Sequence, residues 1–168
     1  IAVSGGYAYL AQGWNGLTIL DLSNLGAISK VGGMQFNDSV RDIEIDGSYA
    51  YLAADWGGLK ILDISDPAGP QEIGQYQPQK SWAQGIALHG DRAYLVGQTD
   101  QAGRLDILDI AQPFAPSLVD TIFSDTDSFN QVDFANGCIF VAGGSGGVSV
   151  LSPEVIKEIS SLDFILTD

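Results

Sequence analysis

The chain has 168 residues with 7 basic and 21 acidic side chains, which gives a formal net charge of −14 at pH 7. This charge repels nucleic-acid phosphates, so we expect no nucleic-acid partner. No stretch approaches the roughly 20 consecutive apolar residues of a membrane-spanning helix, so we expect no membrane insertion. A hydrophobic share of 45%, 21 glycines and a single cysteine fit a globular domain of short strands without an internal disulfide.

One unit is repeated along the whole chain. The segment YAYLA at residues 7–11 returns as YAYLA at 49–53, RAYLV at 92–96 and CIFVA at 138–142. Self-similarity at about 40–45 residues, with several short strands per unit, is typical of β-propellers. We therefore predict an all-β fold: a β-propeller of four-stranded antiparallel blades, with four repeats of about 42–46 residues in one domain. The predicted blades span about 1–39, 40–82, 83–128 and 129–168.

Four strands, named A to D in chain order, are expected in each unit. In the first unit, strand A ends near residue 3, strand B lies at 7–11, strand C at 16–23 and strand D around Val31. From the last Asp or Ser of strand C to the apolar anchor of strand D is always ten residues. The later A–B turns carry dipeptides that favour tight hairpins, Asp46-Gly47, His89-Gly90 and Asn136-Gly137, and prolines mark two C–D turns, Pro67 and Pro113.

The two faces of strand B differ in bulk. One face carries an aromatic residue in every unit, namely Tyr9, Tyr51, Tyr94 and Phe140. The other face carries small and aliphatic residues, Ala8, Ala50 and Ala93 with Leu10, Leu52 and Leu95. Strand C is apolar on both faces, which is typical of a sheet covered on both sides. We expect the bulky and compact faces of successive blades to pack together, with helix confined at most to about 153–158.

Candidate chemistry is sparse. Asp21, Asp63 and Asp109 recur at the end of strand C, where we interpret them as acceptors for turn N–H groups rather than a ring of carboxylates. Residues 125–128 alternate oxygen ligands but lack the Gly and Glu of a calcium hand, which favours a solvated acidic loop. The sequence predicts no catalytic residues, no metal site and no cofactor, because no nucleophile, zinc or phosphate-loop motif is present.

The segments GLTILDLS, GLKILDISDPAGP and GRLDILDIAQPFAP resemble the LVIVD-repeat family, β-propeller repeats of bacteria and archaea. The resemblance covers nearly the whole chain and is weakest after Ser152. It implies a propeller of secreted or surface proteins, so an extracellular or cell-surface location is expected. The family shares no common activity, and the resemblance therefore implies no ligand.

The variable features of the repeat gather on one side of the predicted blades. Only the B–C and D–A connections differ in length between copies, and both emerge on the same face of an antiparallel blade. Variable loops on a rigid scaffold are where binding usually resides. Arg41, Gln84 and Asn130 stand two residues before the strand A anchors Ile43, Ile86 and Val132. The predicted ligand-binding residues are Trp14, Trp56, Trp82, Arg41, Asp55, Gln84 and Asn130.

Alternative interpretations stay open for these residues and for the function. The three Trp side chains could instead cover blade edges, and Arg41, Gln84 and Asn130 could solvate the mouth of a central channel. We expect a non-catalytic binding or scaffolding module that recognises a protein or a glycan. The alternative is a propeller-type enzyme, a lyase or glycan hydrolase, with a carboxylate site in the funnel; the loop face offers Asp38, Asp55, Asp100, Asp125 and Asp127.

Four blades are few for closing a ring. An open arc would expose apolar faces at both ends, which soluble monomers avoid. Three arrangements follow: a compact four-bladed ring, a second copy that completes an eight-bladed ring, or additional blades of the same chain beyond residues 1–168. We favour the last, because residue 1 aligns within strand A of the first unit.

Overall fold

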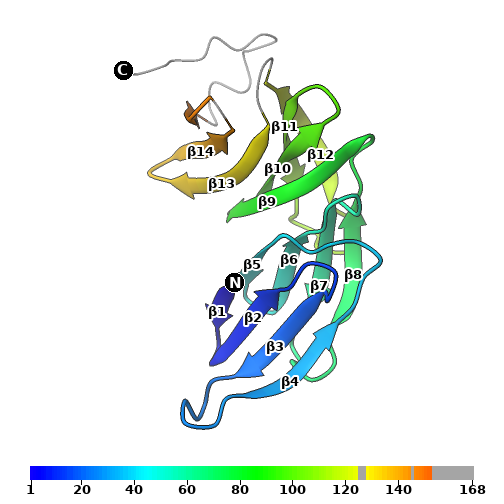
Figure 1. Ribbon diagram of the computed structural model, residues 1–168, viewed down its shortest axis with the longest axis vertical. Coiled ribbons are helices and arrows are strands. Elements are labelled where there is room, and N and C mark those ends of the chain that lie inside the picture. Colours follow the sequence, from blue (N-terminus) through cyan, green and yellow to red (C-terminus); the bar gives the residue numbers. More distant parts are fainter. Residues whose placement is uncertain (125–127, 145, 153–168) are drawn as a thin grey trace.

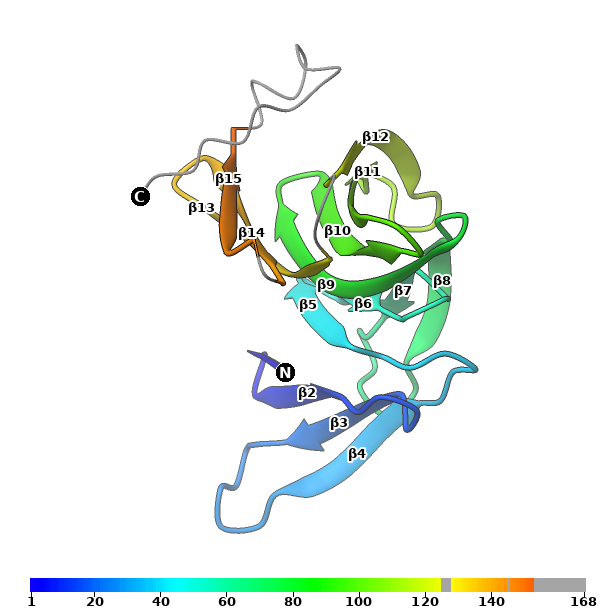
Figure 2. The same cartoon turned by 45° about the horizontal axis from the view of Figure 1, so that its top comes forward.

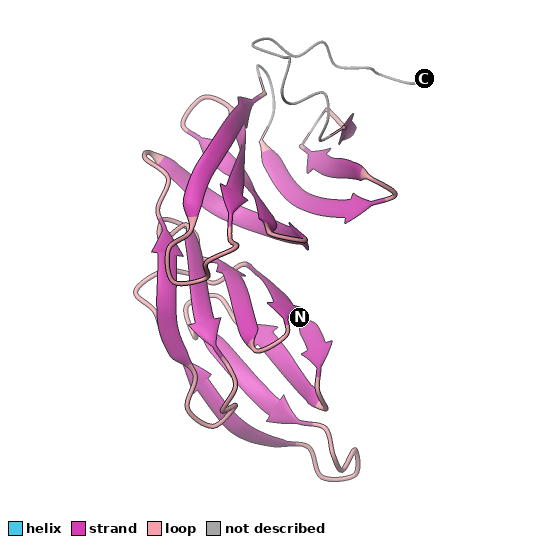
Figure 3. Cartoon of the chain, turned by 180° about the vertical axis from the view of Figure 1, so that it is seen from behind, coloured by secondary structure: helices cyan, strands magenta, loops and turns pink. Residues whose placement is uncertain are grey.

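The computed structural model describes residues 1–124, 128–144 and 146–152, and all regular structure in these ranges is β (Figure 3). The first sheet contains β1 (Ala2–Ser4), β2 (Tyr7–Ala11), β3 (Leu17–Asp21) and β4 (Ser29–Met34). The second contains β5 (Asp42–Asp46), β6 (Tyr49–Ala53), β7 (Leu59–Asp63) and β8 (Gln71–Tyr76). The third contains β9 (Ser81–His89), β10 (Arg92–Thr99), β11 (Gly103–Asp109) and β12 (Ser117–Phe123).

The fourth sheet has three described strands, β13 (Phe129–Ala135), β14 (Cys138–Gly143) and β15 (Val148–Leu151). Neighbouring strands in every sheet follow chain order and run antiparallel. The predicted all-β fold of repeated propeller-type blades is thereby confirmed. The last strand D, the segment around 153–158 and residues Asp125 and Asp127 lie outside the described residues.

The sheets stand side by side along an open arc (Figures 1 and 2). The first strands of successive sheets lie next to one another, β5 beside β9 and β9 beside β13, so strand A of each unit forms the inner side of the arc. The first and fourth sheets stand at the two ends. The chain therefore forms consecutive blades in chain order, each packed on the next.

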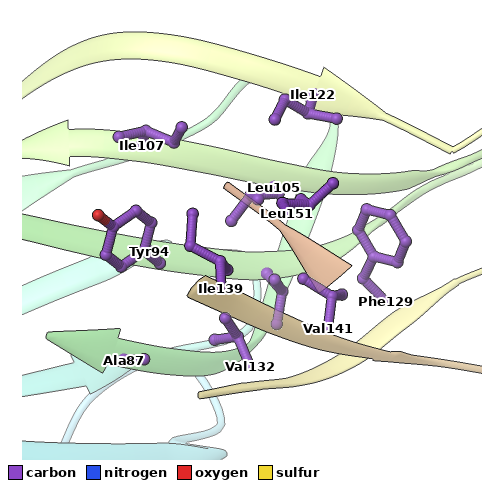
Figure 4. Packing of buried hydrophobic residues seen from close by; sticks show 11 residues of the cluster. Ala87, Tyr94, Leu105, Ile107, Ile122, Phe129, Val132, Ile139, Val141 and Leu151 are labelled. Atoms are coloured by element: carbon purple, nitrogen blue, oxygen red, sulfur yellow. The ribbon is translucent and has the colours of Figure 1, made fainter. Parts of the chain in front are cut away.

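Alternating faces of the sheets form the core. Tyr51, Leu59 and Ile61 of the second sheet pack in one cluster with Leu95 and Leu108 of the third. The same pairing recurs at the other two junctions, and Figure 4 shows the one between the third and fourth sheets. Each junction joins an aromatic face of one sheet to an aliphatic face of the next, which is the packing that strand B predicts.

Strand D has a bulge at its anchor residue. In the first sheet, Ile19 pairs with Gly32 and Leu20 with Lys30, so that Val31 is left between them. Ile73 and Val119 occupy the same place in the second and third sheets. A bulge of this kind bends the strand and increases its twist. The recurring anchor is thus a structural device of the outer strand.

The outer strands leave room for the C–D turn of the following sheet. A Cβ on Gly32 would collide with the carbonyl oxygen of Pro67, and a Cβ on Gly74 would collide with that of Pro113. Both glycines directly follow the bulged anchor residue, and both prolines sit in equivalent turns. In the third sheet Asp120 takes the glycine position. The fourth C–D turn lies outside the described residues.

The aspartates that end strand C hold the C–D turns. The Oδ1 atoms of Asp21 and Asp63 accept the N–H groups of Ser23 and Ser65 at 2.7 and 2.8 Å, and Asp109 accepts that of Ala111 at 3.0 Å. These backbone hydrogen bonds are the main reason that the pKa of each carboxyl lies below its ordinary value. Their interpretation as turn acceptors is confirmed.

Candidate functional site

The B–C loop of one sheet is joined to the start of strand A in the next. Gly13 and Val40 exchange backbone hydrogen bonds of 3.0 Å in both directions, and Ala83 N–H donates to the Asp55 carbonyl at 2.8 Å. Gly13 and Asp55 hold equivalent positions in successive B–C loops. Backbone hydrogen bonds therefore connect neighbouring sheets on the loop face. They restrict the positions of the loop side chains at these junctions.

Arg41 and Asp55 form an ion pair beside the second of these joints. The Asp55 Oδ2 atom accepts hydrogen bonds from Arg41 Nη2 at 2.8 Å and from Nε at 3.3 Å. The Asp55 side chain is only 11% exposed, whereas that of Arg41 is 53% exposed. The residue Asp55 also has a positive φ of 43°, a conformation that Asp tolerates better than most side chains. The pair thus connects the B–C loop to the start of β5, while about half of the Arg41 side chain remains exposed.

Trp56 and Trp82 meet at the same joint. Their ring centroids are 4.9 Å apart, with an angle of 55° between the ring planes. Trp56 is 52% exposed. Its carbonyl oxygen accepts a hydrogen bond of 3.0 Å from the Gln77 side chain. The contact with Trp82 and the hydrogen bond from the D–A loop therefore hold Trp56 in a position where about half of its surface is exposed.

A shallow hollow of about 390 Å³ lies beside Trp56. Its other lining residues come from the D–A loop: Gln77, Pro78, Gln79 and Lys80. Pro78 is buried, whereas Lys80 is exposed and has a positive φ of 53°. These four residues were not predicted from the sequence; the signal that could have found them is their place in one of the two variable loops. We refer to Arg41, Asp55, Trp56, Trp82 and residues 77–80 as the Trp56 site.

Trp14 occupies the equivalent position in the first B–C loop but has different surroundings. It is 70% exposed, so neither Trp14 nor Trp56 serves as a buried lid. The residue that corresponds to Trp82 in the preceding D–A segment is Ser39, which is buried beside Gly13. No aromatic ring contact of Trp14 occurs within the described part of the chain. The structure thus places Trp14 outside the Trp56 site.

Gln84 and Asn130 share one feature of strand A. In β9 the register shifts between Gly85 and Ala83, which leaves Gln84 in a bulge, and in β13 a shift between Gln131 and Phe129 leaves Asn130 in the same place. Arg41 immediately precedes β5 at the equivalent position, where its N–H donates to Ala53. Bulges redirect side chains and are common beside functional sites. Gln84 lies two residues from Trp82, whereas Asn130 belongs to the fourth sheet.

Carboxylates of the inner strands lie close enough to influence each other. The pKa of Glu44 is raised above its ordinary value, mainly by burial and then by the charges of Asp42 and Asp133. Asp55, one of the carboxylates of the enzyme alternative, is already engaged by Arg41. Across residues 1–124, 128–144 and 146–152, no three His, Cys, Asp or Glu side chains gather as metal ligands do, and no helix is long and apolar enough to cross a membrane.

Solved structures similar to this chain share its fold at low sequence identity. The computationally designed Ika4 protein is 15% identical with a TM-score of 0.67, over 89% of this chain and 87% of that one. The β-propeller domain of Cps50 (Swd1) from Myceliophteria thermophila is 12% identical with a TM-score of 0.69, over 89% of this chain and 48% of that one. BamB from Moraxella catarrhalis is 17% identical with a TM-score of 0.65, over 90% and 48%.

The chain spans about half the length of the two natural proteins. Among curated proteins, no sequence matches the chain. A family model, by contrast, matches three times, at residues 1–34, 38–77 and 82–123. These matches coincide with the first three sheets of the arc. The chain belongs to the LVIVD repeat family.

Proposed function

We propose that this chain is a binding or scaffolding module that uses its B–C and D–A loop face, and the Trp56 site in particular, to recognise a protein or a glycan. The observation that carries the proposal is the Trp56–Trp82 pair, whose centroids are 4.9 Å apart and whose outer ring is 52% exposed. Exposed aromatic rings present apolar surface to water, and contact with a partner removes that surface from water. Trp is also enriched among the residues that contribute most of the binding energy at interfaces.

The surroundings of Trp56 suit a ligand with an apolar face and polar edges. The Trp56 indole supplies apolar surface, while Gln79 and Lys80 supply hydrogen-bond donors at the edge of the hollow. Arg41 adds a cation whose position is fixed by Asp55 at 2.8 Å. Sugar rings and the aliphatic or aromatic anchors of a protein loop both present such surfaces. A partly acidic ligand would be favoured by Arg41 and Lys80 despite the acidic surface elsewhere.

The expected location supports the same proposal. A secreted or cell-surface propeller meets glycans and exposed protein loops, and the family resemblance suggests that setting. Several such modules bind through the loops at one end of a rigid scaffold. In this chain the loops at that end carry the Trp56 site, whereas the opposite end repeats the same turn chemistry in sheet after sheet.

The proposal is tested by tryptophan fluorescence titration with a panel of soluble oligosaccharides and with peptides selected from a displayed library on the wild-type chain. For a ligand that binds here, Trp56→Ala should weaken affinity by about 30-fold, which corresponds to about 2 kcal/mol. Trp14→Ala is the matched control, because Trp14 is also exposed and has the equivalent position in the repeat. If both variants retain wild-type affinity for every ligand that the chain binds, the Trp56 site is not the binding surface.

A further inference from the structure

The outward face of the first sheet packs against no other sheet of the described arc. Strand register places Val3, Ala8 and Leu20 on one face, with Leu10 and Thr18 beside them. We call these five residues the head face. Val3 is 67% exposed, Leu10 and Leu20 are half-buried, and the small side chain of Ala8 between them is 5% exposed.

The equivalent residues in the next two sheets are covered. Leu52 and Leu95 correspond to Leu10, and they are 0% and 3% exposed. Leu62 and Leu108 correspond to Leu20, and both are 0% exposed. In each of those sheets the covering surface is the aromatic face of the preceding sheet. The head face therefore has the residues of an inter-sheet junction, and within the described residues no other sheet covers it.

The outward face of the fourth sheet has the complementary character. Register places Phe140 with Val150 and Ala142 with Val148 on one face, which we call the tail face. Val148 and Val150 are 60% and 55% exposed. Their equivalents in the first three sheets are almost fully buried: Leu17, Leu59 and Leu105 at 1%, 0% and 0%, and Ile19, Ile61 and Ile107 at 0%, 0% and 5%.

Every junction inside the arc joins these two kinds of face. Tyr9, Leu17 and Ile19 pack in one cluster with Leu52 and Leu62 of the next sheet. Tyr94, Leu105 and Ile107 pack in the same way with Ile139 and Leu151. A tail face meets a head face each time, and two faces of the same kind never meet. The first and fourth sheets stand at the two ends of the described arc (Figure 2), where Val3 of the head face and Val148 and Val150 of the tail face are more than half exposed.

Of the three arrangements that the sequence leaves open, we propose the second for the 168-residue chain in place of the last: the head and tail faces bind a second copy head to tail, so that two arcs close into one ring. Each copy supplies four sheets, and the two identical junctions are related by a two-fold axis through the ring. In length, one arc is about half of a natural propeller of this fold, because it covers 48% of the Swd1 propeller domain and 48% of BamB, whereas it covers 87% of the designed Ika4 protein. The exposed apolar surface at both ends supplies the driving force.

The mass of the purified 168-residue chain tests this proposal directly. Sedimentation and light scattering in 150 mM salt should give twice 17.7 kDa, which is 35.4 kDa. Higher salt should strengthen the dimer, since each copy carries a net charge of −14. A chain that stays at 17.7 kDa up to about 100 µM overturns the proposal, because a stable interface of this kind should hold well below that concentration.

Variants at either end test the head-to-tail geometry. Val150→Glu on the tail face and Leu20→Glu on the head face should each give a monomer, with Val3→Glu as a second head variant at a more exposed position. An equal mixture of a head variant and the tail variant should again form dimers, through one intact junction, with weaker affinity than the closed ring. A mixture that stays monomeric, or a Val150→Glu chain that still forms dimers by itself, overturns the geometry.

Two controls separate this interface from folding and from ligand binding. Leu25→Glu places a charge at a residue that is 76% exposed in the first C–D turn, outside both faces, and should leave the dimer intact. Trp56→Ala should also leave it intact, because the Trp56 site is on the loop face. Circular dichroism should show wild-type β content for every variant, since the substituted side chains are at least partly exposed.

Discussion

The Oδ2 atom of Asp42 accepts a hydrogen bond of 3.1 Å from the backbone N–H of Ile86, which belongs to strand A of the next sheet. The other carboxylate oxygen accepts the N–H of Ile43 at 2.9 Å. One side chain therefore connects two inner strands that share no ladder. Gly85 and Gln131 stand at the equivalent positions of the third and fourth sheets, so this connection belongs to one junction alone.

Removing this carboxylate should weaken the junction between the second and third sheets. Asp42→Ala should lower the free energy of unfolding by about 2 kcal/mol, because the Ile86 N–H loses a charged acceptor. Asp42→Asn keeps an acceptor oxygen and should lose less than half as much. Urea denaturation of the three chains measures the differences. Equal stability of Asp42→Ala and the wild type would show that water replaces the carboxylate.

Glu44 should destabilise the folded chain at neutral pH. Its pKa is raised above the ordinary value of 4.5, so the folded state binds a proton at this carboxyl more tightly than the unfolded state. Stability therefore falls as pH rises from 4.5 through the folded pKa, and the penalty is complete above it. Glu44→Gln should raise the melting temperature at pH 7, and the gain should vanish below pH 4.5.

A matched control for Glu44 is Glu72→Gln. The Glu72 carboxylate is paired with Lys60 at 3.4 Å, so its removal should give a small loss of stability at pH 7 instead of a gain. Thermal melts of the two variants across pH 4 to 8 distinguish the cases. A Glu44→Gln chain less stable than the wild type at pH 7 would mean that the surroundings of Glu44 stabilise its ionised carboxylate in the folded state.

The contact between strand D and the following C–D turn should be intolerant of any side chain. Gly74→Ala would press a methyl group against the Pro113 carbonyl, and we expect a loss of about 2 kcal/mol or more. Gly69→Ala is the control: its added Cβ would come no closer than 3.4 Å to the Asp66 side chain, and the change should stay within about 0.5 kcal/mol. Denaturant midpoints of both variants measure the contrast, and equal midpoints would contradict the close contact.

Trp56 and Tyr51 should separate binding from stability. Tyr51 is 2% exposed in the core between the second and third sheets, and Tyr51→Ala should cost about 3 kcal/mol of stability. Trp56→Ala removes one ring of an exposed pair and should cost about 1 kcal/mol or less. Calorimetric melting of the two variants checks this order. A Trp56→Ala chain that melts as low as Tyr51→Ala would identify Trp56 as a part of the core.

The fold could be predicted from the sequence because the same residue types recur at the same positions in successive copies of the repeat. An aromatic in strand B, an Asp at the end of strand C and an anchor ten residues later each have one role in the first three copies. Tyr51, Asp63 and Ile73 could therefore be assigned by comparing copies. A single copy would not have distinguished the Asp63 turn from a functional carboxylate.

Long-range polar contacts could not be predicted in this way, because they differ between copies. Asp106 is 1% exposed and accepts two hydrogen bonds from Arg104 and one of 2.6 Å from Thr121. The Tyr76 hydroxyl of the preceding sheet also donates to Asp106, at 3.3 Å. The equivalent residue in the second sheet is Lys60, which pairs with Glu72 instead. The Trp56–Trp82 contact has the same character, since it joins the B–C loop of the second sheet to the start of β9 in the third and has no counterpart at Trp14 among the described residues.

Pro67 lies against Gly32, and Pro113 lies against Gly74. These two contacts set the spacing between neighbouring sheets at their outer strands, and with it the wedge shape of each repeat. This spacing does not depend on the loops at the opposite end, where residues were inserted and exchanged. New recognition surfaces can therefore evolve by loop replacement without altering the curvature of the array. A duplicated unit that keeps its glycine and its proline inherits the same wedge.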